Sequence, residues 1–216
     1  MRRSPGVGPA RVPWGRVTGT DEASRAKADK RATIIVAALD LFAKYGYRRT
    51  SIDDVAKAAG IAKGSVYLHF VGKRELFRAG CETVLAGVLV SVDAVLEREG
   101  PVGERVMALL DAKFTRLHEI IGASPHAAEI LDTTNGIASD IVEAADKRFL
   151  DALAAVLLAA EARGEVALDR LGLTPAQAAA VIFRAAEGTT KEQVATKTYR
   201  KRLQQLVDVL LNGLAR

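Results

Sequence analysis

The sequence is poor in the residues on which disulfide scaffolds, metal centres and β-sheet proteins depend. Of its 216 residues, only Cys81 is a cysteine, three are histidines and 5% are aromatic. A single cysteine excludes a disulfide within one chain and any cluster built from several cysteines. No stretch alternates apolar and polar residues as a half-buried strand does. We therefore expect an all-α protein of a reducing cytoplasm, with a core of small aliphatic side chains.

Long apolar segments and catalytic motifs are also missing. The longest uninterrupted apolar run, 152–160, is too short to cross a bilayer, so no membrane partner is expected. The chain has no His-Glu-x-x-His, no Gly-rich phosphate loop and no Gly-x-Ser-x-Gly turn. His118 with Glu119, or His126 with Glu129, could gather as a metal or acid–base site, but such residues on helices more often line surfaces. We expect no catalytic residue, metal or cofactor.

The positive charge is concentrated in the first part of the chain. Residues 1–80 hold 16 Lys and Arg against 7 Asp and Glu, whereas residues 81–216 hold 15 against 19. This distribution suits a polyanionic partner, since Lys and Arg release counterions from a phosphate backbone; a solvated basic surface is the alternative. Residues 1–24 are rich in Gly, Pro and Arg, which predicts a flexible basic tail. Such a tail would either contact DNA or serve as a disordered, solubilising leader.

The segment 50–70 predicts two short helices joined by a tight turn. Ser51 is placed to cap the first helix, and Gly60, which tolerates positive φ, is placed to end it. On the second helix, Val66 and Phe70 are expected to face inward. Two short helices crossed over a small turn form a helix-turn-helix, and the outer face of its second helix suits nucleic acid. The apolar stripe of the first helix consists of Ile52, Val55, Ala56 and Ala59.

Four segments between residues 30 and 76 carry the pattern of a known family. They are Phe42-Ala-Lys-Tyr-Gly46, the run 50–60, Gly64-Ser-Val-Tyr-Leu-His-Phe70 and Lys73-Arg-Glu-Leu76. In these segments the chain resembles the DNA-binding domain of the TetR/AcrR transcriptional regulators. The resemblance implies an all-helical homodimer. It places a three-helix DNA-binding head at 25–77 and a larger helical domain, for effector binding and dimerisation, at 78–216.

The resemblance also implies which residues contact double-stranded operator DNA. Lys63 and Gly64 stand at positions that look like base contacts. The remaining positions look like phosphate contacts or, in the case of Ser51, lie at the capped start of the first short helix. The predicted DNA-binding residues are Thr50, Ser51, Lys63, Gly64, Ser65, Tyr67, His69 and Lys73.

Helical periodicity continues through the remainder of the chain. The segment 73–98 predicts one long helix shared by both domains, and such a helix is a candidate lever between them. The residues 133–136, Thr-Thr-Asn-Gly, predict a turn. The last two helices either complete a monomer core or pair with a second copy. The predicted helices cover 31–44, 73–98, 102–121, 126–132, 137–163, 175–192 and 199–214.

These patterns favour a repressor that a small hydrophobic effector releases from a palindromic operator. The alternative is a helical enzyme or small-molecule carrier whose basic head is incidental. The helices between residues 73 and 163 are expected to enclose an apolar cavity for the effector. Phe114, His118 and Phe149 are placed near this cavity, with plain core packing as the equal alternative for each.

Overall fold

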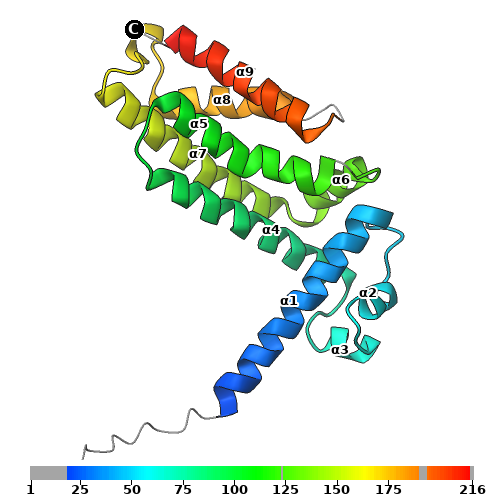
Figure 1. The fold of residues 1–216 in the computed structure, drawn as a ribbon. Helices are drawn as coiled ribbons and strands as arrows, with labels where there is room; N and C mark the ends of the chain where they lie inside the picture. Colours follow the sequence, from blue (N-terminus) through cyan, green and yellow to red (C-terminus); the bar gives the residue numbers. More distant parts are fainter. Residues whose placement is uncertain (1–18, 123, 190–193, 215–216) are drawn as a thin grey trace, which may run out of the picture.

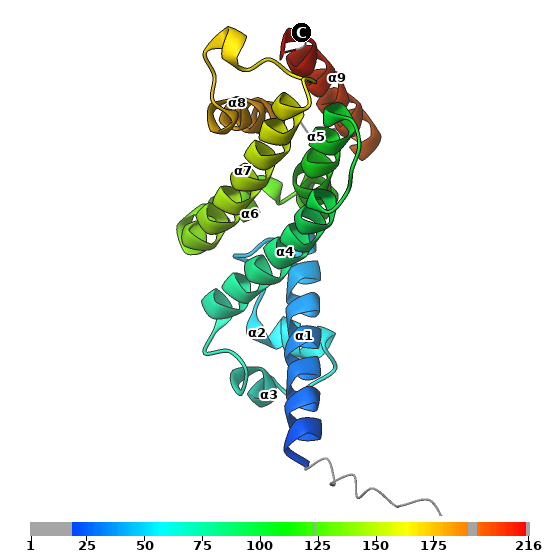
Figure 2. The same cartoon turned by 90° about the vertical axis from the view of Figure 1, so that its left-hand side faces the viewer.

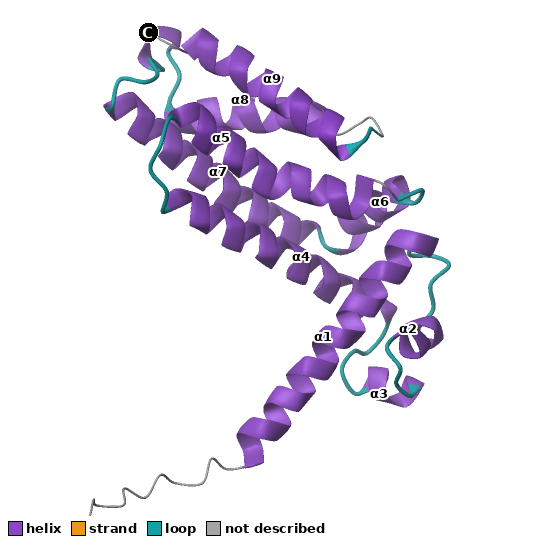
Figure 3. Ribbon diagram, in the orientation of Figure 1, coloured by secondary structure: helices purple, strands orange, loops and turns teal. Residues whose placement is uncertain are grey.

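A computed structural model describes residues 19–122, 124–189 and 194–214, and most of this part is helical (Figures 1 and 3). The described residues form no strand, which confirms the all-α expectation. Two short π-helical segments, η1 (Asp111–Thr115) and η2 (His118–Gly122), and a 3₁₀ turn, η3 (Asp169–Leu171), accompany the α-helices. The α-helices are α1 (Gly19–Tyr45), α2 (Ile52–Ala58), α3 (Lys63–Tyr67), α4 (Lys73–Leu96), α5 (Val102–Leu110), α6 (Ala127–Ile137), α7 (Ser139–Ala162), α8 (Pro175–Gly188) and α9 (Thr196–Leu214).

The apolar side chains gather in two separate clusters. We call the part built from α1, α2, α3 and the start of α4 the head, and the rest of the chain the body. The body cluster extends from Val88 in α4 to Leu214 in α9. One member of the head cluster, Ile130, comes from α6 of the body. The other buried residues of the head cluster are Ile34, Ile35, Ala38, Phe42, Ile52, Val55, Ala56, Val66, Phe70, Leu76, Phe77 and Ala79.

Helix α4 belongs to both clusters. Leu76 and Phe77 are buried in the head, whereas Val88 and Val92 are buried in the body. By length and composition alone this helix could cross a membrane. Its packing into both clusters instead gives it the character of a core helix that joins the head to the body. The long shared helix expected over 73–98 is therefore present, and it ends at Leu96.

Polar bonds fasten the body to the far end of α1 and the loop that follows it. A carboxylate oxygen of Glu129 in α6 accepts a hydrogen bond of 2.7 Å from the backbone nitrogen of Arg48. The Ser124 hydroxyl donates to the carbonyl oxygen of Ala43 over 2.5 Å. Together with Ile130, these bonds make α6 and the loop before it a second connection between body and head, beside α4.

Helix α1 begins earlier than the apolar stripe indicated. The stripe starts at Ile34, but the helix is formed from Gly19 onwards, so residues 19–24 are helical and not part of a flexible tail. The stretch 24–33 is rich in Ala, Lys and Arg, which favour helix without any core contact. Because these residues are exposed, periodicity could not detect them. The rest of the expected tail, residues 1–18, lies outside the described residues.

The turn expected at 133–136 is wrong, because α6 continues through it to Ile137. The Thr134 hydroxyl donates to the carbonyl oxygen of Ile130, one turn earlier in the same helix. At the end of α6, Ile137 packs against the head cluster and its carbonyl oxygen accepts a hydrogen bond from Arg78. These contacts override the weak helix propensity of Thr, Asn and Gly.

The helix expected over 102–121 is interrupted by the two π-helical segments. Such segments hold one more residue per turn than an α-helix and often mark functional sites. In η1 the wider turn carries both Lys113 and Phe114 into the body, where both are buried. The sequence gives no signal for this change, since the apolar spacing around Phe114 fits a regular α-helix equally well.

Candidate nucleic-acid interface

Helix α3 presents one buried and one exposed face, as the spacing of its residues predicts. Val66 and Phe70 are buried in the head cluster. Lys63, Gly64 and Tyr67 are exposed on the opposite side of the helix, whose N-terminal turn is open to solvent. A cation, a glycine and a phenol therefore lie together on the surface of a helix whose first turn faces outward, which is the arrangement that enters a major groove.

The turn before α3 and the cap of α2 confirm the expected local chemistry. Gly60 has a φ of +68°, in the left-handed region. The Ser51 hydroxyl accepts a hydrogen bond of 3.1 Å from the backbone nitrogen of Asp54, and the Asp54 carboxylate accepts one of 2.9 Å from the backbone nitrogen of Ser51. The Ser51 hydroxyl also donates to this carboxylate over 2.6 Å, and this bond, together with the one from the Ser51 backbone nitrogen, holds the pKa of Asp54 below its ordinary value. Ser51 thus fixes the start of α2 and remains exposed.

Lys63 shares a carboxylate with a neighbouring lysine. Its ammonium nitrogen lies 3.8 Å from one oxygen of Asp53, and that of Lys57 lies 3.1 Å from the other. Both lysine side chains are more than half exposed, so these ion pairs hold them only weakly. Lys63 is therefore free to exchange Asp53 for a base edge or a phosphate.

The hydroxyl of Thr50 is engaged inside the head. It is 2% exposed, and its hydroxyl donates to the carbonyl oxygen of Gly46 over 2.8 Å. Since a hydroxyl has one proton to donate and a phosphate only accepts, that bond leaves nothing to offer DNA. A contact between the Thr50 hydroxyl and a phosphate stays a prediction and would require this bond to be exchanged. Thr50 closes the loop between α1 and α2, which a sequence pattern cannot distinguish from a phosphate contact.

Lys73 has its ammonium protons engaged inside the head. The ammonium nitrogen donates to the carbonyl oxygens of Tyr47, Arg48 and Thr50 over 2.9, 3.2 and 2.9 Å. It also lies 4.5 Å from the centroid of the Tyr47 ring. In this arrangement Lys73 ties the start of α4 to the loop after α1, and a phosphate could bind it only by replacing one of these bonds.

Two further predicted residues, Ser65 and His69, lie half-buried at the edge of the exposed face. Among the described residues, the buried Nδ1 atom of His69 has no hydrogen-bond partner. Leu68 and Val71, which are not among the predicted residues, are 78% and 88% exposed beside α3. Their outward direction could have been inferred, because Val66 and Phe70 face inward.

The residues predicted to line an effector cavity occupy two different environments. Phe114 and Phe149 are buried, and their rings lie with that of Phe183 at centroid distances of 5.5–6.0 Å. The ammonium group of Lys113 lies within 5.8 Å of all three ring centroids and 2.5 Å from a carboxylate oxygen of Asp146. Phe114 and Phe149 therefore belong to packed core, the alternative that the sequence left open.

His118 lies apart from that aromatic group. Its ring stacks on the buried ring of Tyr199 at a centroid distance of 4.3 Å, and its Nε2 atom is 2.8 Å from the carbonyl oxygen of Val194. Burial raises the pKa of Tyr199. His118 thus joins η2 to α9 and to the residues just before it.

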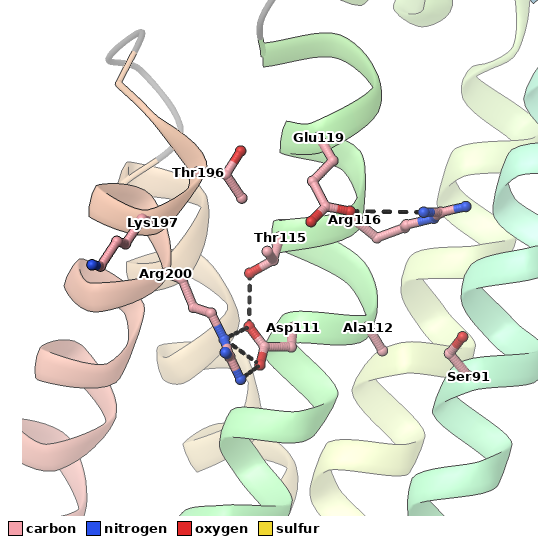
Figure 4. Close-up of a pocket in the computed structure, with 9 residues that line it drawn as sticks. All are labelled: Ser91, Asp111, Ala112, Thr115, Arg116, Glu119, Thr196, Lys197 and Arg200. Atoms are coloured by element: carbon pink, nitrogen blue, oxygen red, sulfur yellow. Dashed lines mark hydrogen bonds and ion pairs between the residues drawn. The ribbon is translucent and has the colours of Figure 1, made fainter.

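An open hollow of about 500 Å³ lies between α4, η1 and α9 (Figure 4). Eight of its nine lining residues have polar or charged side chains, and among them Arg116 and Glu119 lie 3.7 Å apart. Asp111 accepts bonds from Arg200 at 2.7 Å and from the Thr115 hydroxyl at 2.8 Å. The pairing with Asp111 raises the pKa of Arg200 above its ordinary value. The hollow is therefore a charged surface feature, unlike the apolar cavity that the sequence predicted.

Comparison with known proteins places the head in a described family. Residues 34–79 match the profile of "Bacterial regulatory proteins, tetR family". The chain is 34% identical over 94 residues to YhgD, an HTH-type transcriptional regulator of Bacillus subtilis, covering 43% of this chain and 49% of that protein. It is 34% identical over 104 residues to the HTH-type transcriptional repressor KstR2 of Rhodococcus jostii, covering 48% and 49%.

The fold of the whole described chain has solved counterparts. A TetR/AcrR family transcriptional regulator from Thermobifida fusca superposes with a TM-score of 0.66 at 24% identity, over 87% of this chain and all of that one. The chain spans about half the length of the curated relatives that it matches. All three proteins are named as transcriptional regulators or repressors.

The head and the body together define an all-helical protein with an N-terminal helix-turn-helix. Residues 34–79 within this protein match the tetR family of bacterial regulatory proteins.

Proposed function

We propose that this protein is a cytoplasmic DNA-binding transcriptional regulator that represses its targets from a palindromic operator. The observation that supports this most is the exposed face of α3, on which Lys63, Gly64 and Tyr67 are open to solvent above the buried Val66. The name of KstR2, a repressor, favours repression over activation. The basic head supplies the charge that non-specific attraction to DNA requires.

A mobility-shift experiment tests this proposal. The full chain is mixed with duplex DNA from upstream of its own coding region, and separately with random duplex of equal length, at near-physiological salt. A regulator of this kind binds specific sites at least about a thousandfold more tightly than random DNA. Equal affinity for both duplexes would favour the alternative, a helical enzyme or carrier with an incidental basic head.

We further propose a homodimer formed through the outer faces of α8 and α9. Their inner faces complete the body core with Ile182, Phe183 and Leu203. Outside that core, Val181 and Val209 are 49% and 71% exposed and border an apolar groove that also includes Leu171. A dimer would hold two recognition helices about 34 Å apart, or a multiple of this distance, to read a palindrome.

Charge placed on this outer face tests the dimer. Val209→Asp should yield monomers that keep their helix content and lose operator binding, as sedimentation and circular dichroism would show. Leu206→Asp is a less specific test, because Leu206 packs against the body cluster and a charge there also threatens folding. A wild-type chain that sediments as a monomer at micromolar concentration would refute the dimer.

A small hydrophobic effector is proposed to bind the body and release the operator. The body is linked to the head through both α4 and α6, so a ligand that prefers another placement of these helices would lower DNA affinity. An effector near Phe114 must open the aromatic core, whereas one in the hollow would meet Asp111 and Arg200. Apolar compounds with and without a charged end can be screened for thermal stabilisation and then for DNA release. Tight ligands that leave DNA affinity unchanged would refute this regulation.

A further inference from the structure

The first turns of α1 project beyond the head. In both views α1 continues past α3 on the side away from the body (Figures 1 and 2). Every residue from 24 to 33 is exposed, and Ile34, which follows this stretch, is buried. This projecting segment therefore extends past α3 on the side of the head that is away from the body.

In the projecting segment, the helix positions that continue the buried apolar stripe are occupied by lysine and arginine. Arg31 precedes the buried Ile35 by four residues, and Lys27 precedes Arg31 by four. Lys30 follows Lys27 by three residues. Residues at these spacings share one helix face. Arg31 shows where that face points, because its guanidinium carbon lies 5.0 Å from the ring centroid of Phe70, just after α3. The face of α1 that packs into the head cluster thus becomes cationic where the head ends.

This cationic face is not neutralised within the described part of the chain. Residues 26–33 include Lys27, Lys30 and Arg31 and a single acidic residue, Asp29. Neither Lys27 nor Lys30 forms an ion pair with a described residue, and both side chains are exposed. The same face of α1 is apolar inside the head and cationic beyond it. This change favours a partner with an anionic surface.

We propose that the face formed by Lys27, Lys30 and Arg31 binds backbone phosphates of the duplex that flanks the bases read by α3. This inference rests on the proposed function, because it requires α3 to lie against DNA. At about 1.5 Å of rise per residue, the segment 24–33 is about 15 Å long. DNA carries one negative charge per about 1.7 Å of its axis, so such a segment lies within reach of several phosphates.

Two duplexes and two matched variants test this face. The protein first selects its site from a randomised pool. That site is then prepared as a trimmed duplex, which ends at the selected bases, and as a long duplex, which continues well beyond them. Lys27→Gln/Lys30→Gln removes two charges from the proposed face. Lys44→Gln/Lys147→Gln removes two exposed lysines elsewhere, at the other end of α1 and on α7.

The measured quantity is the dependence of affinity on salt concentration. The wild type should show a steeper salt dependence on the long duplex than on the trimmed one. Lys27→Gln/Lys30→Gln should reduce the log–log slope on the long duplex by about 0.9 for each phosphate that the face no longer neutralises, and the control variant should leave it unchanged. Circular dichroism confirms that α1 persists, since Gln favours helix about as well as Lys.

Two results would overturn the inference in distinguishable ways. If both variants bind the long duplex with the same slope as the wild type, the face does not contact flanking DNA, although the protein still reads its site. If the wild type selects no sequence and binds all duplexes alike, the proposed function fails and this inference fails with it.

Discussion

Arg78 in α4 and Asp140 in α7 form an ion pair with two parallel hydrogen bonds, each 2.7 Å long. Arg78 donates a further bond of 2.7 Å to the carbonyl oxygen of Ile137, where α6 ends. One guanidinium therefore joins three helices at the boundary between head and body. Its hydrogen bonds to the carboxylate are the main reason that the pKa of Asp140 falls from an ordinary 3.8 to about 2.

This shift predicts a defined pH dependence of stability. Because the folded-state pKa of Asp140 lies below its unfolded value, the ion pair stabilises the folded protein above about pH 3.8 and this contribution is lost as the pH falls towards about 2. Asp140→Asn should therefore lower the unfolding temperature near neutral pH, and the difference from wild type should fade between these two values. Asp151→Asn, which removes an exposed pair with Lys147, is the control. A deficit of Asp140→Asn that is constant with pH would contradict the assignment.

We expect Gly64 to allow close approach of α3 to DNA, and we do not expect the fold to require a glycine there. A Cβ atom added there would meet no atom within 4 Å, and the same is true of Gly87 in α4. Each Gly→Ala substitution should therefore keep or raise stability, by up to about 1 kcal/mol, because Ala favours helix. Only Gly64→Ala should weaken specific DNA binding, by about 1 to 3 kcal/mol, the scale of one base-reading interaction. Mobility shifts on both variants would show this, and equal affinities would remove Gly64 from the interface.

Lys63 and Lys57 offer a matched pair, because both contact the carboxylate of Asp53. Lys63→Ala should relax discrimination by about 1 to 3 kcal/mol at particular base pairs, since Lys63 stands at a predicted base contact. Lys57→Ala removes the same charge from α2 and should leave that discrimination intact. Binding to a panel of single-base operator variants separates the two. Equal losses on specific and random DNA for Lys63→Ala would refute its base-reading role.

Lys73 should matter for folding even without DNA. Lys73→Met keeps the length of the side chain but leaves the carbonyl oxygens of Tyr47, Arg48 and Thr50 without their donor. We expect a loss of about 2 kcal/mol in the free energy of unfolding, measured in urea. Arg74→Met, at the exposed neighbouring position, should change it by less than about 0.5 kcal/mol. An unchanged stability combined with weaker DNA binding would return Lys73 to its predicted phosphate role.

The sequence predicts the helix-turn-helix well because the interactions that form it are between residues close in the sequence. Gly60 needs only its own backbone freedom, and Ser51 needs only a partner three residues away. The inward direction of Val66 and Phe70 follows from helical spacing. Each of these features could be inferred without knowing what lies elsewhere in the chain, and each is confirmed.

Long-range contacts decide the features that the sequence does not predict. Thr50 and Lys73 share their residue types with phosphate contacts, but carbonyl oxygens from the loop after α1 engage both. The turn expected at 133–136 is helical because Ile137 meets the head and Arg78. Phe114 lies in packed core because Phe183, far along the chain, covers it. No local pattern contains this information.

Ile130 lies in α6, yet its side chain is buried in the head cluster. A fragment that ended after α4 would expose the apolar surface that Ile130 covers and would lose the bond from Arg48 to Glu129. The family match at residues 34–79 therefore marks a recognisable unit of sequence but not a self-sufficient piece of protein. Grafting this head onto a foreign body would require a substitute for α6, and melting of the natural chain should follow a single cooperative transition.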